Sequence, residues 1–228
     1  TAGTGSEVGR SSVISTDDTH QKKIIFTPRL LPPLVLADPE LTLGLPAGIT
    51  AATGVDALTH LVEAFLAKGH HAMADGIALE GVRMVNEALV AAVGFAQRGH
   101  ANLSAEEQAA HLAARATMLE ASMMGATAFQ KGLGAIHALS HPIGALYNTH
   151  HGTTNAVVMQ AVLDFNRPAI EDRLSLACNY LGIAGGFDGF RAFVGTLNDS
   201  LGIPVSLAAM GITEPDRDVL LKGAPKDP

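Results

Sequence analysis

Apolar positions recur at helical spacing through most of the chain after Pro46. This spacing predicts that the chain is helical from residue 46 onward. The individual helices are predicted over 54–64, 72–97, 104–130, 132–146, 154–166, 168–181 and 187–201. Ser104 and Glu107 have the spacing of a capping box, and Pro168 and Pro215 can each occupy the first turn of a helix. The first 45 residues instead contain Thr, Gly and Ser clusters and the β-branched run KKIIF, which indicate loops and short strands. We expect a mainly α fold with six to eight helices and little strand.

The stretch GVDALTHLVEA, residues 54–64, places three polar residues on one helix face. Asp56, His60 and Glu63 stand at i, i+4 and i+7, which fall within roughly 60° of one another around the helix axis. A carboxylate one turn before an imidazole is a possible metal-binding or proton-transfer pair. A solvated helix face explains the same pattern, so the stretch alone does not decide between the two interpretations.

A second group of histidines follows in HALSHPIGALYNTHHG, which holds four of the ten histidines in the chain. His137 and His141 are one helical turn apart, and His151 comes after a Tyr-Asn-Thr turn signal. Asp56 and His60 with His137 and His151 would supply three imidazoles and one carboxylate. Nitrogen and oxygen ligands without thiolate suit Fe(II), Zn(II), Ni(II) or Mn(II). Alternatively, these histidines are core or surface residues unrelated to Asp56.

Composition narrows the class of protein. The chain has 228 residues, 47% hydrophobic and 16% charged, which is enough apolar material for one or two packed domains. No apolar run reaches 18 residues, so we expect no membrane partner, and a net charge of −7 without a Lys/Arg-rich run argues against nucleic acid. The single Cys178 cannot form an internal disulfide, which fits a cytoplasmic protein.

Three motifs carry a resemblance to a known family. TAGTGSEV, AATGVDALTHLVEAF and GAIHALSHPIGALYNTHHG resemble, in this order and separation, the iron-containing (group III) alcohol dehydrogenases, over essentially the whole chain. In that family an α/β half with a Gly-rich phosphate loop binds NAD(P), and a helical half holds the metal. The resemblance implies a dehydroquinate synthase-like fold, with 46–228 as the helical metal-binding domain and 1–45 as a strand-and-loop segment of the cofactor side. Because the sequence starts inside a Gly/Thr-rich loop without Met, we expect a fragment that lacks the nucleotide-binding half.

The resemblance also assigns roles to individual residues. It implies Asp56, His60, His137 and His151 as the metal ligands. Glu63 would orient a ligand, although a surface position explains it equally well. His150 stands where the family usually has Pro, which puts a second imidazole beside His151. His141, between metal and nicotinamide in the family, is the candidate for proton relay and for a coenzyme contact.

Coenzyme contacts are implied mainly in the first segment. They are Thr1, Thr4, Gly9, Ser11, Lys22, Leu41, Gly44 and Leu45. A packing role for Leu41 and Leu45 is as plausible as a contact with the coenzyme.

The resemblance implies an NAD(P)-dependent, metal-dependent alcohol dehydrogenase that acts on a small alcohol, aldehyde or hydroxy acid by hydride transfer. Fe(II) is the expected metal, with Zn, Ni or Mn as alternatives, and a homo-oligomer is the expected assembly. A metal-dependent lyase or hydrolase on the same scaffold would predict Arg and Lys near the site, yet residues 132–166 contain none. A helical metal-holding or assembly module without activity of its own is the third interpretation.

Overall fold

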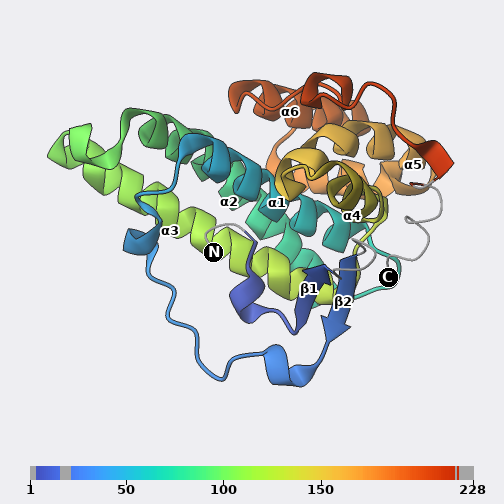
Figure 1. Cartoon of the computed structure of the whole chain (residues 1–228), viewed down its shortest axis with the longest axis horizontal. Helices are drawn as coiled ribbons and strands as arrows, with labels where there is room; N and C mark the ends of the chain where they lie inside the picture. The colour runs from blue at the N-terminus through green and yellow to red at the C-terminus, as the bar shows by residue number, and fades with distance from the viewer. Residues whose placement is uncertain (1–3, 16–21, 219, 221–228) are drawn as a thin grey trace.

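The computed structural model describes residues 4–15, 22–218 and 220. A two-stranded antiparallel hairpin precedes six α-helices in this part of the chain (Figure 1). The strands are β1 (Ser11–Ser15) and β2 (Lys22–Phe26), with Ser11 opposite Phe26. The helices are α1 (Ala47–Leu66), α2 (Ala72–Arg98), α3 (Ala105–Ala128), α4 (Ala135–Tyr147), α5 (His151–Leu181) and α6 (Gly186–Ser200). The predicted mainly α fold with little strand is confirmed.

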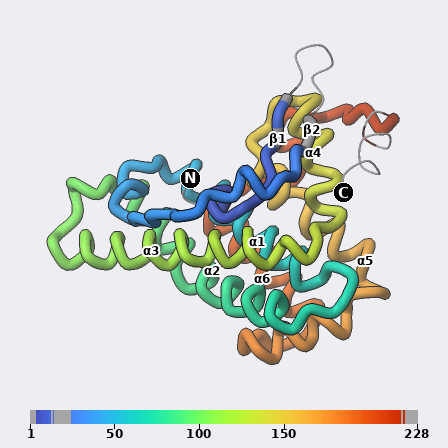
Figure 2. The backbone as a smooth tube through the Cα atoms, turned by 90° about the horizontal axis from the view of Figure 1, so that it is seen from below, coloured from blue at the N-terminus to red at the C-terminus, as the bar shows by residue number. Residues whose placement is uncertain are grey.

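Helix α1 lies at the centre of the molecule, packed against α2, α3 and α5 (Figures 1 and 2). Fifteen of its 20 residues are buried, and these include polar as well as apolar side chains. By length and composition α1 could cross a membrane, but 83% of its most apolar window is buried inside the protein. Its apolar character is therefore that of a core helix.

The C-terminal end of α1 is held by two cations from distant segments. Lys131 Nζ and Arg173 Nε donate to the Phe65 carbonyl oxygen at 3.3 and 3.1 Å. Both cations also pair with Asp75 on α2, at 2.7 Å from Lys131 and 3.1 Å from Arg173. Positive charge at a helix C-terminus offsets the partial negative charge of its unpaired carbonyls, so this cluster fixes the end of the helix that carries His60 and Glu63.

A predicted break between two helices is wrong. The expected break before Pro168 does not occur, because α5 continues through this residue from His151 to Leu181. Pro168 lacks an N–H and leaves the Asp164 carbonyl without its helical donor. Both residues are exposed, so water can hydrate that carbonyl while α1 and α6 hold the two ends of the helix. The helix expected after Pro215 is seen at 217, 218 and 220, and its continuation lies outside the described residues.

Candidate metal centre

Three helices meet at the predicted metal site. Helix α1 presents Asp56 and His60 on one face, and α4 presents His137. Helix α4 ends at Tyr147, and the residue that caps it, Asn148, has a left-handed backbone conformation with φ of 51°. Asparagine tolerates this conformation better than most residues, and it reverses the chain so that α5 starts at His151 beside His137.

The ligand atoms converge. Asp56, His60 and His137 each offer one ligand atom within 4.8 Å of the others, and all three residues are buried. His151 comes from α5, where its Nε2 lies 3.4 Å from Asp56 Oδ1, and His137 Nε2 lies 3.9 Å from the same oxygen. Ligands 2.0–2.2 Å from a tetrahedral ion stand roughly 3.4 Å apart. The spacing of these side chains therefore fits a small divalent ion.

Glu63 is buried, so the surface position considered from sequence is wrong. Its side chain is 4% exposed. Its Oε2 lies 2.6 Å from His137 Nδ1, and its Oε1 accepts from the Ile136 N–H at 2.6 Å. A carboxylate at this distance accepts a hydrogen bond from Nδ1–H, so the hydrogen of the neutral ring is on Nδ1. The lone pair of His137 Nε2 is then directed toward Asp56. Glu63 thereby sets the tautomer that a metal ligand requires.

Burial also sets the charge state of the cluster. It lowers the pKa of His60 to about 4, against the attraction of Asp56 and Glu63. Burial likewise lowers the pKa of His151 to about 3. For Asp56 burial acts upward, but the facing imidazoles and a hydrogen bond from Asn155 outweigh it and lower the pKa. Near neutral pH His60 and His151 are therefore neutral and Asp56 is ionised, which are the forms that bind metal.

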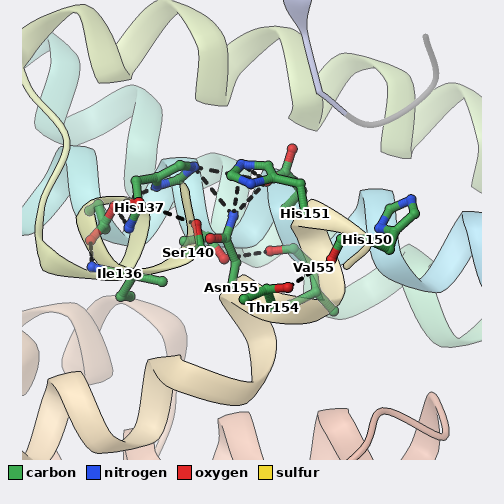
Figure 3. A network of polar contacts seen from close by, with 11 residues as sticks. Val55, Ile136, His137, Ser140, His150, His151, Thr154 and Asn155 are labelled. Atoms are coloured by element: carbon green, nitrogen blue, oxygen red, sulfur yellow. Dashed lines mark hydrogen bonds and ion pairs between the residues drawn. The ribbon is translucent and has the colours of Figure 1, made fainter. Parts of the chain in front are cut away.

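The two remaining histidines of this region differ in position. His141 is stacked on His151, with ring centroids 5.0 Å apart and planes 20° apart, and its ring lies edge-on to His137 at 5.7 Å. His150 is exposed and points away from the cluster (Figure 3). The structure thus places His151 and not His150 among the candidate ligands.

The predicted coenzyme contacts other than His141 lie along the first segment. Thr4 precedes the short turn Ser6–Val8, Gly9 ends it, and Ser11 begins β1. Leu41 and Leu45 line a cavity of about 260 Å³ between residues 35–45, Glu7 and Leu119 of α3, and Gly44 is exposed between them. Leu41 is 82% exposed, so it buries little of its side chain against the described residues. Thr1 and the side chain of Lys22 lie outside the described residues.

Sequence reasoning missed Asn155, which lies among the candidate ligands (Figure 3). The only local signal was its position on α5, one turn after His151. A single asparagine at that spacing is common in helices and predicts no site.

Comparison with known proteins places this geometry in a family. The family model of the Fe-containing alcohol dehydrogenase family, C-terminal part, matches residues 50–227. The chain belongs to the iron-containing alcohol dehydrogenase family. A 4-hydroxybutyrate dehydrogenase of Cupriavidus necator is 44% identical over 98% of the chain and 57% of the relative. The NAD-dependent methanol dehydrogenase of Bacillus methanolicus is 35% identical over 100% of the chain and 58% of the relative.

Solved structures agree with the assignment to the iron-containing alcohol dehydrogenases. The crystal structure of a 1,3-propanediol oxidoreductase superposes with a TM-score of 0.88 at 34% identity, over 100% of this chain and 58% of that one. A sulfoacetaldehyde reductase from Bifidobacterium kashiwanohense, solved with NAD⁺, gives a TM-score of 0.84 at 28% identity over 98% of this chain and 56% of that one. The chain therefore spans a little over half the length of these relatives, and it has the fold of their helical part.

Proposed function

We propose that the full-length protein is a metal-dependent alcohol dehydrogenase that transfers hydride between a small alcohol and NAD(P). The observation that supports this most strongly is the convergence of Asp56 Oδ1, His137 Nε2 and His151 Nε2, together with His60, in a site where Glu63 fixes one imidazole. Such a donor set serves a Lewis acid, and the family membership supplies the reaction class.

The proposed ligands are Asp56, His60, His137 and His151, and Fe(II) is the proposed ion, with Zn, Ni and Mn as competitors for the same donors. When bound, a divalent ion lowers the pKa of an alcohol hydroxyl by several units. Three neutral imidazoles and one carboxylate would hold a dipositive ion at a net charge of about +1, and this positive charge would favour the deprotonated form of an alcohol. The burial of Asp56, His60 and His137 keeps water from these side chains.

His141 is the proposed proton relay. It is half-buried, stacked on His151, and outside the proposed ligand set. An imidazole in this place can take a proton from the reacting hydroxyl and pass it toward solvent. In the reverse direction it would return a proton as the carbonyl is reduced.

The coenzyme and substrate classes follow from the relatives. One relative is named as NAD-dependent and one structure holds NAD⁺, which supports a nicotinamide coenzyme here. The relatives named for methanol, 1,3-propanediol and 4-hydroxybutyrate support a small primary alcohol or a hydroxy acid as substrate. The proposed coenzyme contacts are Thr1, Thr4, Gly9, Ser11, Lys22, Leu41, Gly44, Leu45 and His141. We also propose that the protein is cytoplasmic and forms a homo-oligomer. Sedimentation of the full-length protein will test the oligomeric state.

Two neighbouring variants test the metal site. In the full-length protein His151→Ala should remove most of the bound divalent metal and the alcohol oxidation with it, because it deletes a proposed ligand. His150→Ala is the matched control and should retain both, since that side chain points away from the cluster. Elemental analysis and a panel of small alcohols with NAD and NADP provide the measurements. Metal retention by His151→Ala with loss by His150→Ala would show that the neighbouring histidine is the ligand.

A further inference from the structure

Asn155 occupies a position that the proposed function leaves unexplained. It lies on α5, one turn after His151, and is fully buried. Its Nδ2 is 2.8 Å from Asp56 Oδ1, 3.3 Å from His137 Nε2 and 3.3 Å from His151 Nε2 (Figure 3). The amide nitrogen thus contacts the same three atoms that the proposed function assigns to the ion.

In these contacts Asn155 is the hydrogen-bond donor and the facing atoms are acceptors. A carboxylate oxygen only accepts hydrogen bonds, and His137 Nε2 is an acceptor because its Nδ1 hydrogen faces Glu63. An amide NH₂ offers two hydrogens and no useful lone pair, so Asn155 serves these facing acceptors as the donor. Buried lone pairs that face one another repel unless a donor or a cation lies between them. Asn155 supplies that donor.

The oxygen of the Asn155 amide does not take part in these contacts. Asn155 Oδ1 is buried and has no hydrogen-bond partner among the described residues. Buried polar atoms are usually paired, so an amide held only through its nitrogen end indicates that the contacts with the ligand atoms determine its orientation. Packing alone would not select this orientation, since the oxygen and nitrogen ends of an amide have nearly the same size.

We propose that Asn155 is a positioning residue of the metal site, whose N–H groups hold Asp56, His137 and His151 in the binding arrangement before the ion arrives. This inference rests on the proposed function, from which it takes the ligand set. Groups that orient metal ligands from outside typically change metal affinity by about 10–100-fold when they are removed. The two hydrogens of Asn155 Nδ2 are shared among one carboxylate oxygen and two imidazole nitrogens.

A matched pair of asparagines provides the test. Asn198 on α6 is half-buried and contacts α5 through its amide. Its Nδ2 donates to the Ala156 carbonyl at 3.2 Å, and its Oδ1 is buried without a partner among the described residues. It has no contact with the ligand cluster in the part of the chain that the structure describes. Asn155→Ala, on α5, and Asn198→Ala, on α6 against α5, therefore each remove an amide that contacts α5 or belongs to it, but only Asn155 has hydrogen bonds to the ligand atoms.

The experiment is a Co(II) titration of the metal-free full-length protein, followed by competition with a chelator and by the visible absorption of bound Co(II). We expect Asn155→Ala to weaken Co(II) binding by about 10–100-fold and to alter the absorption, with Asn198→Ala close to wild type. Asn155→Leu, which keeps the branched shape and the number of side-chain heavy atoms but donates nothing, should lose affinity as well and replaces the alanine variant if that variant does not fold.

Three outcomes would overturn the inference: Co(II) affinity within about twofold of wild type in Asn155→Ala, full affinity in Asn155→Leu, or equal losses in both alanine variants. The last would mean that α5 merely loosens. Failure of the proposed function is distinct, because then the wild-type protein itself would not bind Co(II), or His151→Ala would bind it as well as wild type.

Discussion

Some residues of the metal site could be predicted from local sequence pattern and others could not. Helical periodicity placed Asp56, His60 and Glu63 on one face, and the structure has them there. Periodicity could not show that this face is buried, because α4, which covers Glu63, lies more than 70 residues further along the chain. Asn155 could not be found for the same reason: its three partners are brought to it by α1, α4 and the start of α5.

His141 gives the prediction at this scale. In the full-length enzyme His141→Ala should keep its metal and lower kcat for alcohol oxidation by about 10²–10⁴, because it removes the proposed proton relay and no proposed ligand. Metal content and steady-state kinetics on the same preparation check this. If the loss is confined to the KM for the coenzyme or to thermal stability, His141 has only a packing role. Loss of the metal would make His141 a ligand.

Elements were predictable where the signal is local. The capping box of Ser104 and Glu107 forms at the start of α3 as expected, with Glu107 N–H donating to Ser104 Oγ at 3.3 Å and Ser104 N–H to Glu107 Oε2 at 2.9 Å. The break at Pro168 was not predictable from proline alone, because the exposure of that turn and the packing of α5 on either side of it decide whether the helix continues.

The close approach of α5 to α1 leads to a second prediction. A Cβ added at Gly152 would lie 1.9 Å from the Ala52 carbonyl oxygen and 3.1 Å from Asp56 Cβ. Gly152→Ala must therefore push the start of α5 away from α1, and we expect it to destabilise the fold by about 1–3 kcal/mol and to weaken metal binding through His151 and Asp56.

Gly76→Ala is the matched control for Gly152→Ala. Gly76 lies inside α2, is exposed, and has open space around an added Cβ. Alanine there should stabilise the protein by roughly 0.5–1 kcal/mol, since it lowers the entropy of the unfolded chain and favours helix. Urea unfolding of the two variants should give changes of opposite sign. A neutral Gly152→Ala would mean that the two helices separate without cost.

At the scale of the whole molecule, a buried polar network joins the start of α1 to α3. Arg115 is 3% exposed and donates to Thr50 Oγ1 at 2.8 Å, to the Leu45 carbonyl at 3.2 Å and to His111 Nε2 at 3.0 Å. His111 Nδ1 lies 3.1 Å from His100 Nδ1. Because Arg115 donates to Nε2, His111 must be neutral and carry its hydrogen on Nδ1, which in turn makes His100 Nδ1 the acceptor.

This network makes the stability of the fold depend on pH. Burial, followed by Arg115 and His100, lowers the pKa of His111 to about 4 from an ordinary value of 6.5. The unfolded chain therefore binds the proton first, so the stability from this group is complete above about pH 6.5 and is lost as the pH falls toward 4. For a fully buried imidazole the loss is on the order of 2–3 kcal/mol.

His111→Gln isolates this contribution. A glutamine amide can accept from Arg115 and donate to His100 but does not titrate in this range. We expect the free energy of unfolding of the metal-free protein to fall less steeply between pH 6.5 and 4 in His111→Gln than in wild type. His60 and His151, whose pKa values burial also lowers, contribute the same acid loss to both proteins and so cancel in the difference. Parallel slopes in urea titrations at pH 7, 5.5 and 4.5 would show that His111 accepts a proton in the folded protein as readily as in the unfolded chain.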